Sequence, residues 1–125
     1  MVEFISRYEK RQTYKIVDSA NITLSIDSTL GYESAGRGNK VGFFCIREKT
    51  FPFSSFRFGW PVKKNYKGLF WTDKSSLSEI SRVINFLHKK NYSTKKKVIH
   101  KELKNIIAFD EGNKKFLSLI KKLDI

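Results

Sequence analysis

Cationic and aromatic side chains interleave between residues 40 and 71, and this segment has the composition that points most clearly to chemistry. Cations can follow a phosphate backbone while exposed rings stack on unpaired bases, each stacked base contributing about 1–3 kcal/mol. The pattern therefore predicts a surface that binds single-stranded nucleic acid. The candidate binding residues are Lys40, Arg47, Lys49, Phe53, Arg57, Lys63, Lys64, Tyr66, Lys67 and Trp71.

The aromatic rings of this segment have a second interpretation, as hydrophobic core. Phe56, Phe58 and Trp60 would share one face of an extended strand, because successive side chains of a strand point to opposite faces. Such a face would pack a sheet against a helix. We expect Phe53 and Tyr66, with Trp71, to be the rings that face a ligand, since they lie nearest to lysines and chain breaks.

Patterns typical of catalysis or metal binding are weak. The single cysteine, Cys45, excludes an internal disulfide and a thiolate metal site. His88 and His100 lie in lysine-rich helical segments, where a solvated role is the ordinary one. A nuclease would need clustered carboxylates to hold metal ions. The spacing of Asp18, Asp27, Glu33 and Glu48 is not diagnostic, so we expect a protein that is not an enzyme and has no cofactor, with a small nuclease as a third alternative.

The net charge is strongly positive and unevenly distributed. Twenty-five Lys and Arg against 12 Asp and Glu give +13, of which +1 lies in residues 1–40, +5 in 41–74 and +7 in 75–125. A polyanion is the natural partner of such a chain. Nineteen of the 25 cations are lysines, which favours contacts to a phosphate backbone over base-specific readout by arginine. The alternatives are an acidic protein surface, bound by a small interaction protein that could be virus-encoded, and a merely solubilising lysine face.

Length and hydropathy indicate a single domain over residues 1–125. No stretch approaches the roughly 18 apolar residues of a transmembrane helix. The first residues also lack the pattern of a signal peptide. We therefore expect an intracellular protein with no membrane partner.

The periodicity predicts an α+β fold, with an antiparallel sheet in about residues 10–72 and helices over about residues 76–125. The predicted strands span 14–17, 22–26, 41–49, 54–60 and 68–72, and the glycine-rich segment 31–39 is a predicted loop. Ser76 and Glu79 have the spacing of a capping box before a helix over 76–90. A basic break at 91–97 precedes helices near 98–107 and 116–123.

Residues 41–87 resemble the single-stranded-DNA-binding domain of the positive cofactor four family of transcriptional coactivators. The resemblance lies in the strand end Cys45-Ile46-Arg47-Glu48, the segment Lys63-Lys64-Asn65-Tyr66-Lys67-Gly68-Leu69-Phe70-Trp71-Thr72, and the amphipathic stretch Leu77 to Leu87. It implies a curved antiparallel sheet backed by a helix, a homodimer, and ligand contacts at Arg47, Lys64 and Lys67. The expected function is binding of single-stranded DNA or RNA in transcription or replication.

Overall fold

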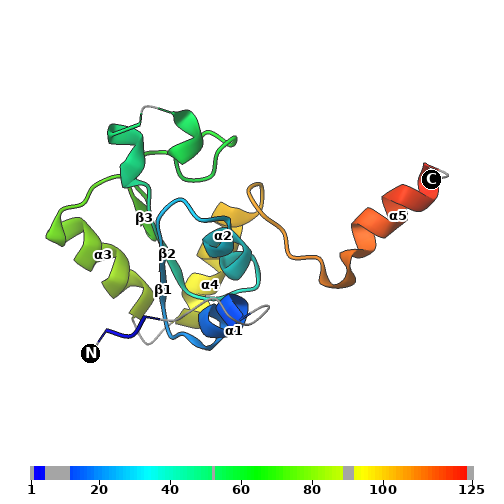
Figure 1. The fold of residues 1–125 in the computed structure, drawn as a ribbon, viewed down its shortest axis with the longest axis horizontal. Coiled ribbons are helices and arrows are strands. Elements are labelled where there is room, and N and C mark those ends of the chain that lie inside the picture. Colours follow the sequence, from blue (N-terminus) through cyan, green and yellow to red (C-terminus); the bar gives the residue numbers. More distant parts are fainter. Residues whose placement is uncertain (1, 5–11, 52, 89–91, 124–125) are drawn as a thin grey trace.

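The computed structural model describes residues 2–4, 12–51, 53–88 and 92–123 of the chain. Helices and strands alternate along it (Figure 1). The strands are β1 (Thr23–Ser25), β2 (Val41–Phe44) and β3 (Trp71–Thr72). The α-helices are α1 (Gln12–Ser19), α2 (Thr29–Gly36), α3 (Leu77–His88), α4 (Tyr92–Leu103) and α5 (Lys114–Lys122), and short 3-10 helices span Ile46–Lys49 (η1), Ser54–Phe56 (η2) and Glu111–Asn113 (η3).

The three strands form one parallel sheet in the order β1-β2-β3. Thr23 pairs with Val41, and Phe43 pairs with Trp71. The predicted antiparallel sheet is therefore wrong. All four residues of β2 are buried, as is typical of a parallel strand that is covered on both faces and so reads as a continuous apolar run. Parallel neighbours also need a crossover, and α2 supplies the one between β1 and β2.

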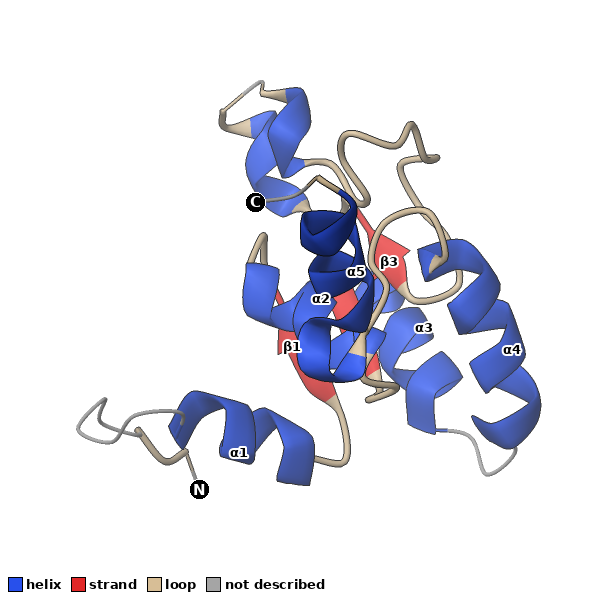
Figure 2. Cartoon of the chain, turned by 90° about the vertical axis from the view of Figure 1, so that its right-hand side faces the viewer, coloured by secondary structure: helices blue, strands red, loops and turns tan. Residues whose placement is uncertain are grey.

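Helices cover both faces of the sheet, with α3 on one face and α2 and α4 on the other (Figures 1 and 2). The α+β class, with strands first and helices afterwards, is therefore wrong, because α1 and α2 lie within the first 40 residues. Residues 14–17, a predicted strand, belong to α1, and most of the predicted loop 31–39 belongs to α2. Short helices depend on tertiary contacts more than on local propensity, so the local pattern did not reveal them.

Polar contacts hold α1 against α2 and the residues that follow it. The Tyr14 hydroxyl donates to Glu33 at 2.6 Å, and an Arg37 amino nitrogen (Nη2) donates to Asp18 at 2.7 Å. Asn39 also donates to Asp18, at 2.6 Å. These bonds lower the pKa of Asp18, the bond from Arg37 contributing most.

Several other segments differ from their predicted structure, because they form turns or helices where strands or breaks were expected. Residues 54–60 form η2 and turns, and the strand predicted over 41–49 ends at Phe44, where η1 follows. The predicted break at 91–97 lies within α4 from Tyr92 on, and residue 91 is outside the described residues. The helix predicted over 76–90 is confirmed as α3, and the one predicted over 116–123 as α5.

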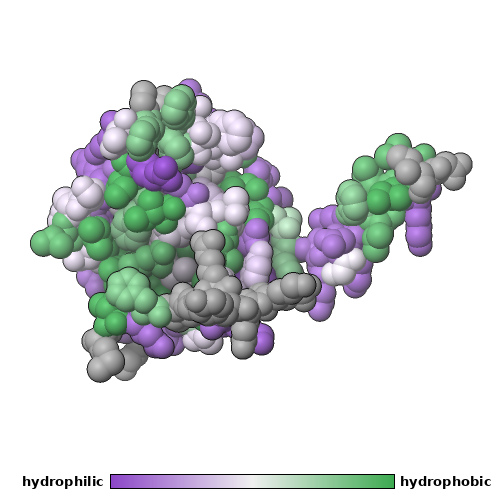
Figure 3. Space-filling view, in the orientation of Figure 1, coloured by the Kyte–Doolittle hydropathy of each residue, from purple (hydrophilic) through white to green (hydrophobic). Residues whose placement is uncertain are grey.

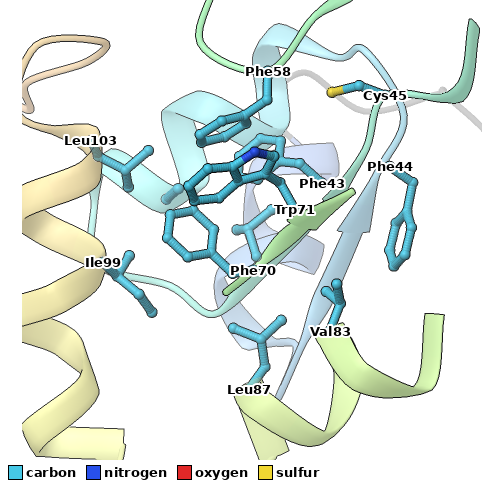
Figure 4. Close-up of a cluster of buried hydrophobic side chains, with 12 residues drawn as sticks. Phe43, Phe44, Cys45, Phe58, Phe70, Trp71, Val83, Leu87, Ile99 and Leu103 are labelled. Carbon is cyan, nitrogen blue, oxygen red and sulfur yellow. The ribbon is translucent and has the colours of Figure 1, made fainter. Parts of the chain in front are cut away.

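An aromatic cluster forms the core between the sheet and α4 (Figure 4). Phe43 and Phe70 are almost fully buried, and the rings of Phe58 and Trp71 stack with their centroids 4.4 Å apart. The Trp71 indole nitrogen donates to the backbone carbonyl of Asn65 at 2.9 Å, so its one polar group is satisfied. On the other face, α3 packs so closely that a Cβ at Gly42 would lie 2.9 Å from Val83.

The residues of the predicted capping box make other contacts. The Glu79 carboxylate accepts hydrogen bonds from Thr72 at 3.1 Å and from Arg82 at 2.9 Å, and the Ser76 hydroxyl lies 3.2 Å from that of Ser78. Glu79 therefore ties the start of α3 to β3. Within the described ranges, no helix combines the length and the apolar character that crossing a bilayer requires.

Candidate functional site at the carboxyl edge of the sheet

The loops that follow the three strands meet at one edge, because parallel strands all end on the same side of a sheet. Open parallel sheets with helices on both faces bind ligands outside the carboxyl ends of their strands. Here β1 is followed by Asp27 and Ser28, which lead into α2. The strand β2 is followed by Cys45 and by Arg47 on η1, and β3 by Asp73. Asp27 and Arg47 come together across this edge.

Asp27 is a buried carboxylate in an unusual backbone conformation. Its φ is +52°, a left-handed value that is uncommon outside glycine, although Asp and Asn tolerate it best. The side chain is 5% exposed, and within the described part of the chain neither carboxylate oxygen has a hydrogen-bond partner. The guanidinium Nε of Arg47 lies 3.7 Å from Oδ2. Burial raises the pKa of Asp27, and the Arg47 charge offsets part of that rise.

The amino terminus of α2 lies directly after this carboxylate. Ser28 has the extended conformation of an N-cap residue, but its side chain makes no capping hydrogen bond. Ser28 and Thr29 are both exposed residues. The first amides of a helix have no partner within the helix, and the helix dipole favours an anion there.

Glycine at position 31 allows α2 to lie close to β1. A Cβ at Gly31 would overlap the side chain of Ser25, the last residue of β1. Any larger residue would push the first turn of α2 away from the sheet. The tight packing thus fixes the position of the helix terminus relative to Asp27.

Arg47 is held by aromatic rings and remains half exposed. Its guanidinium lies 4.8 Å from the centroid of Phe56 and 5.8 Å from that of Phe51. The side chain is 50% exposed, so it faces solvent as well as Asp27. A guanidinium with free donors binds phosphate or carboxylate groups through paired hydrogen bonds.

A hollow of about 310 Å³ lies beside the start of α2. Its lining residues are Thr29, Tyr32, Glu33, Trp60, Ile106 and Ile107. The Trp60 side chain is 55% exposed, and the Tyr32 hydroxyl accepts the Gly59 amide at 2.9 Å, which fastens the Trp60 segment to α2. Burial raises the pKa of Tyr32 to about 12, so this hydroxyl stays protonated near neutral pH. The hollow combines aromatic faces with polar groups, which is the usual make-up of a small-molecule site.

The residues predicted as a binding surface lie in three different surroundings. Trp71 is in the core, whereas Phe53 and Tyr66 are 62% and 57% exposed. Lys40 precedes β2, at the opposite edge of the sheet from Arg47.

Most of the remaining cations are engaged with carboxylates. Lys64 pairs with Glu102 at 2.8 Å, Lys67 with Glu79 at 3.8 Å and Arg57 with Glu48 at 3.5 Å. The Arg57 guanidinium also lies 4.1 Å from the Tyr66 ring centroid. Lys49 and Lys63 are exposed, and Arg57, Lys63 and Lys64 line a second hollow, of about 240 Å³, together with Trp60.

Sequence reasoning considered Asp27 only as one of several scattered carboxylates and did not single out Ser28 or Thr29. A signal was present, because the strand at 22–26 is followed by an Asp-Ser-Thr run that is typical of a helix start. The glycine-rich segment 31–39 predicts a loop, and a loop there leaves no helix for this run to begin.

The scan against protein families finds one model that matches residues 2–124, described as "putative O-antigen biosynthesis protein". The chain belongs to this family. Neither the curated proteins nor the solved structures contain a match.

Family membership overturns the expected function. The resemblance to the positive cofactor four family is wrong, and so is the inferred binding of single-stranded nucleic acid in transcription or replication. The structure gives the physical reason for the first error. That resemblance needs an antiparallel sheet with a face open to a ligand, whereas here β2 is buried at every position and helices cover both faces.

Proposed function

We propose that this protein acts in O-antigen biosynthesis by binding a phosphate-activated sugar at the carboxyl edge of its sheet. The chemical class that fits best is a sugar nucleotide, a sugar esterified to a nucleoside diphosphate. An O-antigen is a polysaccharide, and polysaccharides are assembled from sugars activated in this way. The observation that carries the proposal is the buried carboxylate of Asp27, which lies beside Arg47 and the start of α2 and accepts no hydrogen bond from the described residues.

Each part of such a ligand has a matching group at this edge. The phosphates would accept hydrogen bonds from the first amides of α2, from Ser28 and Thr29, and from Arg47. Sugar or ribose hydroxyls would donate to Asp27, giving its oxygens the partners they lack. A flat ring would lie against Trp60 in the hollow beside Thr29. The site thus offers groups for both the anionic and the hydroxyl-rich parts of one ligand.

We further propose that the chain contributes binding rather than catalysis, in line with the expectation from sequence. Cys45 is buried, and burial raises the pKa of its thiol to about 12, which keeps it from acting as a thiolate nucleophile. His88 and His100 lie on α3 and α4, outside the loops of the carboxyl edge.

The test is a calorimetric titration of the full chain with sugar nucleotides that differ in their base, using the free sugar and the free nucleoside diphosphate as reference ligands. We expect the sugar nucleotide to bind more tightly than either reference. Arg47→Gln should weaken binding by roughly ten- to a hundredfold, the usual effect of losing charge-assisted hydrogen bonds.

The matched control is Lys101→Gln, which removes one positive charge from the exposed surface of α4. It should leave the affinity within about twofold, because Lys101 lines neither of the two hollows described and its exposed charge is screened by salt. Equal losses in the two variants would mean that only net charge matters. Equal affinity for sugar nucleotide, free diphosphate and free sugar would also contradict the proposal.

A further inference from the structure

The helix α5 projects from the rest of the molecule (Figure 1). Eight of its nine residues are exposed, and the ninth, Ile120, is intermediate. Phe116, Leu119 and the adjoining Leu123 are each about 60% exposed, and Leu117 is 51% exposed. Large apolar side chains gathered on an exposed element mark an interaction surface.

The side chains of α5 separate into two faces. At 3.6 residues per turn, the apolar residues fall on one continuous arc of the helix, and the opposite arc carries lysines and one serine. Space-filling colours show green side chains along the projecting helix and purple ones at its base and lower side (Figure 3). The apolar arc consists of Phe116, Leu117, Leu119, Ile120 and Leu123, and the polar arc of Lys114, Lys115, Ser118, Lys121 and Lys122.

Such a helix needs a partner to be stable. A helix of nine residues is marginal in water when no tertiary packing supports it. The polar arc carries four lysines and no carboxylate. The partner should therefore offer an apolar region to the apolar arc and negative charge to the lysines. A second copy of this chain is disfavoured, because each copy carries +13.

We propose that α5 is an interfacial helix that binds the anionic surface of a lipid bilayer. Its apolar arc would enter the boundary between headgroups and acyl chains, and its lysines would lie at the level of the anionic headgroups. Lysines suit a diffuse charged surface, since they act as point charges and do not require paired acceptors. This inference departs from the expectation of no membrane partner, and it is independent of the sugar-nucleotide site.

The test is co-sedimentation of the full chain with vesicles of phosphatidylcholine alone or mixed with phosphatidylglycerol. We expect binding to the mixed vesicles and little binding to phosphatidylcholine. Joint replacement of Lys121 and Lys122 by Gln should weaken binding roughly 25-fold, about fivefold for each lysine near the surface. Leu119→Gln should also weaken it severalfold through lost apolar burial.

The control is joint replacement of Lys101 and Lys104 by Gln, which removes the same charge from the body of the molecule. Equal losses in the two lysine pairs, or equal binding to both kinds of vesicle, would overturn the proposal. A lower melting temperature or a smaller particle mass by light scattering for Leu119→Gln would overturn it too, since the apolar arc would then be covered by protein. Sugar-nucleotide affinity should be unchanged in the α5 variants, so the two proposals can fail separately.

Discussion

Two carboxylates near the carboxyl edge of the sheet have opposite surroundings. Glu79 accepts hydrogen bonds from Thr72 and Arg82, and these bonds, chiefly the one from Arg82, lower its pKa. Asp27 is buried with no hydrogen-bond partner in the described ranges, and burial raises its pKa. The Glu79 carboxylate is thus part of a hydrogen-bond network with Thr72 and Arg82, whereas the Asp27 carboxylate can still accept hydrogen bonds.

Arg82 extends the completed network to the backbone of β3. It donates to the carbonyl oxygens of Gly68 at 2.7 Å and Trp71 at 3.3 Å, as well as to Glu79. Networks in which every polar group is satisfied fix one structure, whereas an unsatisfied buried group costs stability. The hydrogen bonds of Glu79 tie α3 to β3, whereas our proposal assigns the oxygens of Asp27 to a ligand.

The largest effect should come from breaking the network around Glu79. Arg82→Met should reduce the free energy of unfolding by about 2–3 kcal/mol, because carbonyl and carboxylate acceptors lose a charged donor. Chemical denaturation of the variant measures this cost, and Lys101→Met, at an exposed position of α4, is the control. A change below about 0.5 kcal/mol, the range of ordinary surface substitutions, would show that the network does not stabilise the fold.

Removing the charge of Asp27 should have the opposite effect on stability. Asp27→Asn keeps a side chain that tolerates a left-handed backbone and removes a buried charge that lacks hydrogen bonds. We expect a gain of about 1 kcal/mol in the free energy of unfolding and a weaker affinity for sugar nucleotides. Thermal unfolding and calorimetric titration of the same variant measure both. A loss of stability would mean that the carboxylate supports the fold, as Glu79 does.

The two carboxylates should also respond to pH with opposite signs. The folded pKa of Asp27 is raised, so wild type should gain stability relative to Asp27→Asn as pH falls through that pKa toward the ordinary value of about 3.9. The folded pKa of Glu79 is lowered. Wild type should therefore lose stability relative to Glu79→Gln as pH falls below the ordinary value of about 4.3. Denaturation between about pH 7 and pH 3 measures both differences in unfolding free energy. If wild type and each variant changed equally with pH, the two carboxylates would not differ in the way described.

The smallest stability effect is expected at Ser28. An N-cap serine normally contributes about 1 kcal/mol, but the Ser28 side chain makes no capping bond. Ser28→Ala should therefore change the free energy of unfolding by less than about 0.5 kcal/mol, while sugar-nucleotide binding weakens severalfold. If Ser28→Ala instead lost about 1 kcal/mol of unfolding free energy and kept its affinity for sugar nucleotides, the hydroxyl would serve stability and not binding.

The sequence by itself determined the elements with strong local patterns. The apolar spacing from Leu77 to Leu87 was enough to locate α3, and alternation around Leu24 located β1. The cation excess was also evident, but it could not identify a partner, since most cations between 57 and 67 turn out to pair with carboxylates from distant segments.

Tertiary structure alone decided the direction of the strands, the helicity of residues 12–19 and the location of the candidate site. Strand direction is set by hydrogen bonds between segments far apart in the chain, and β2 shows how a buried parallel strand carries no alternation to reveal it. The interleaved rings near Trp71 could be read as core or as ligand surface, because composition does not encode burial. Asp27 became a candidate site residue only when folding placed it beside Arg47 and buried its oxygens without hydrogen bonds to the described residues.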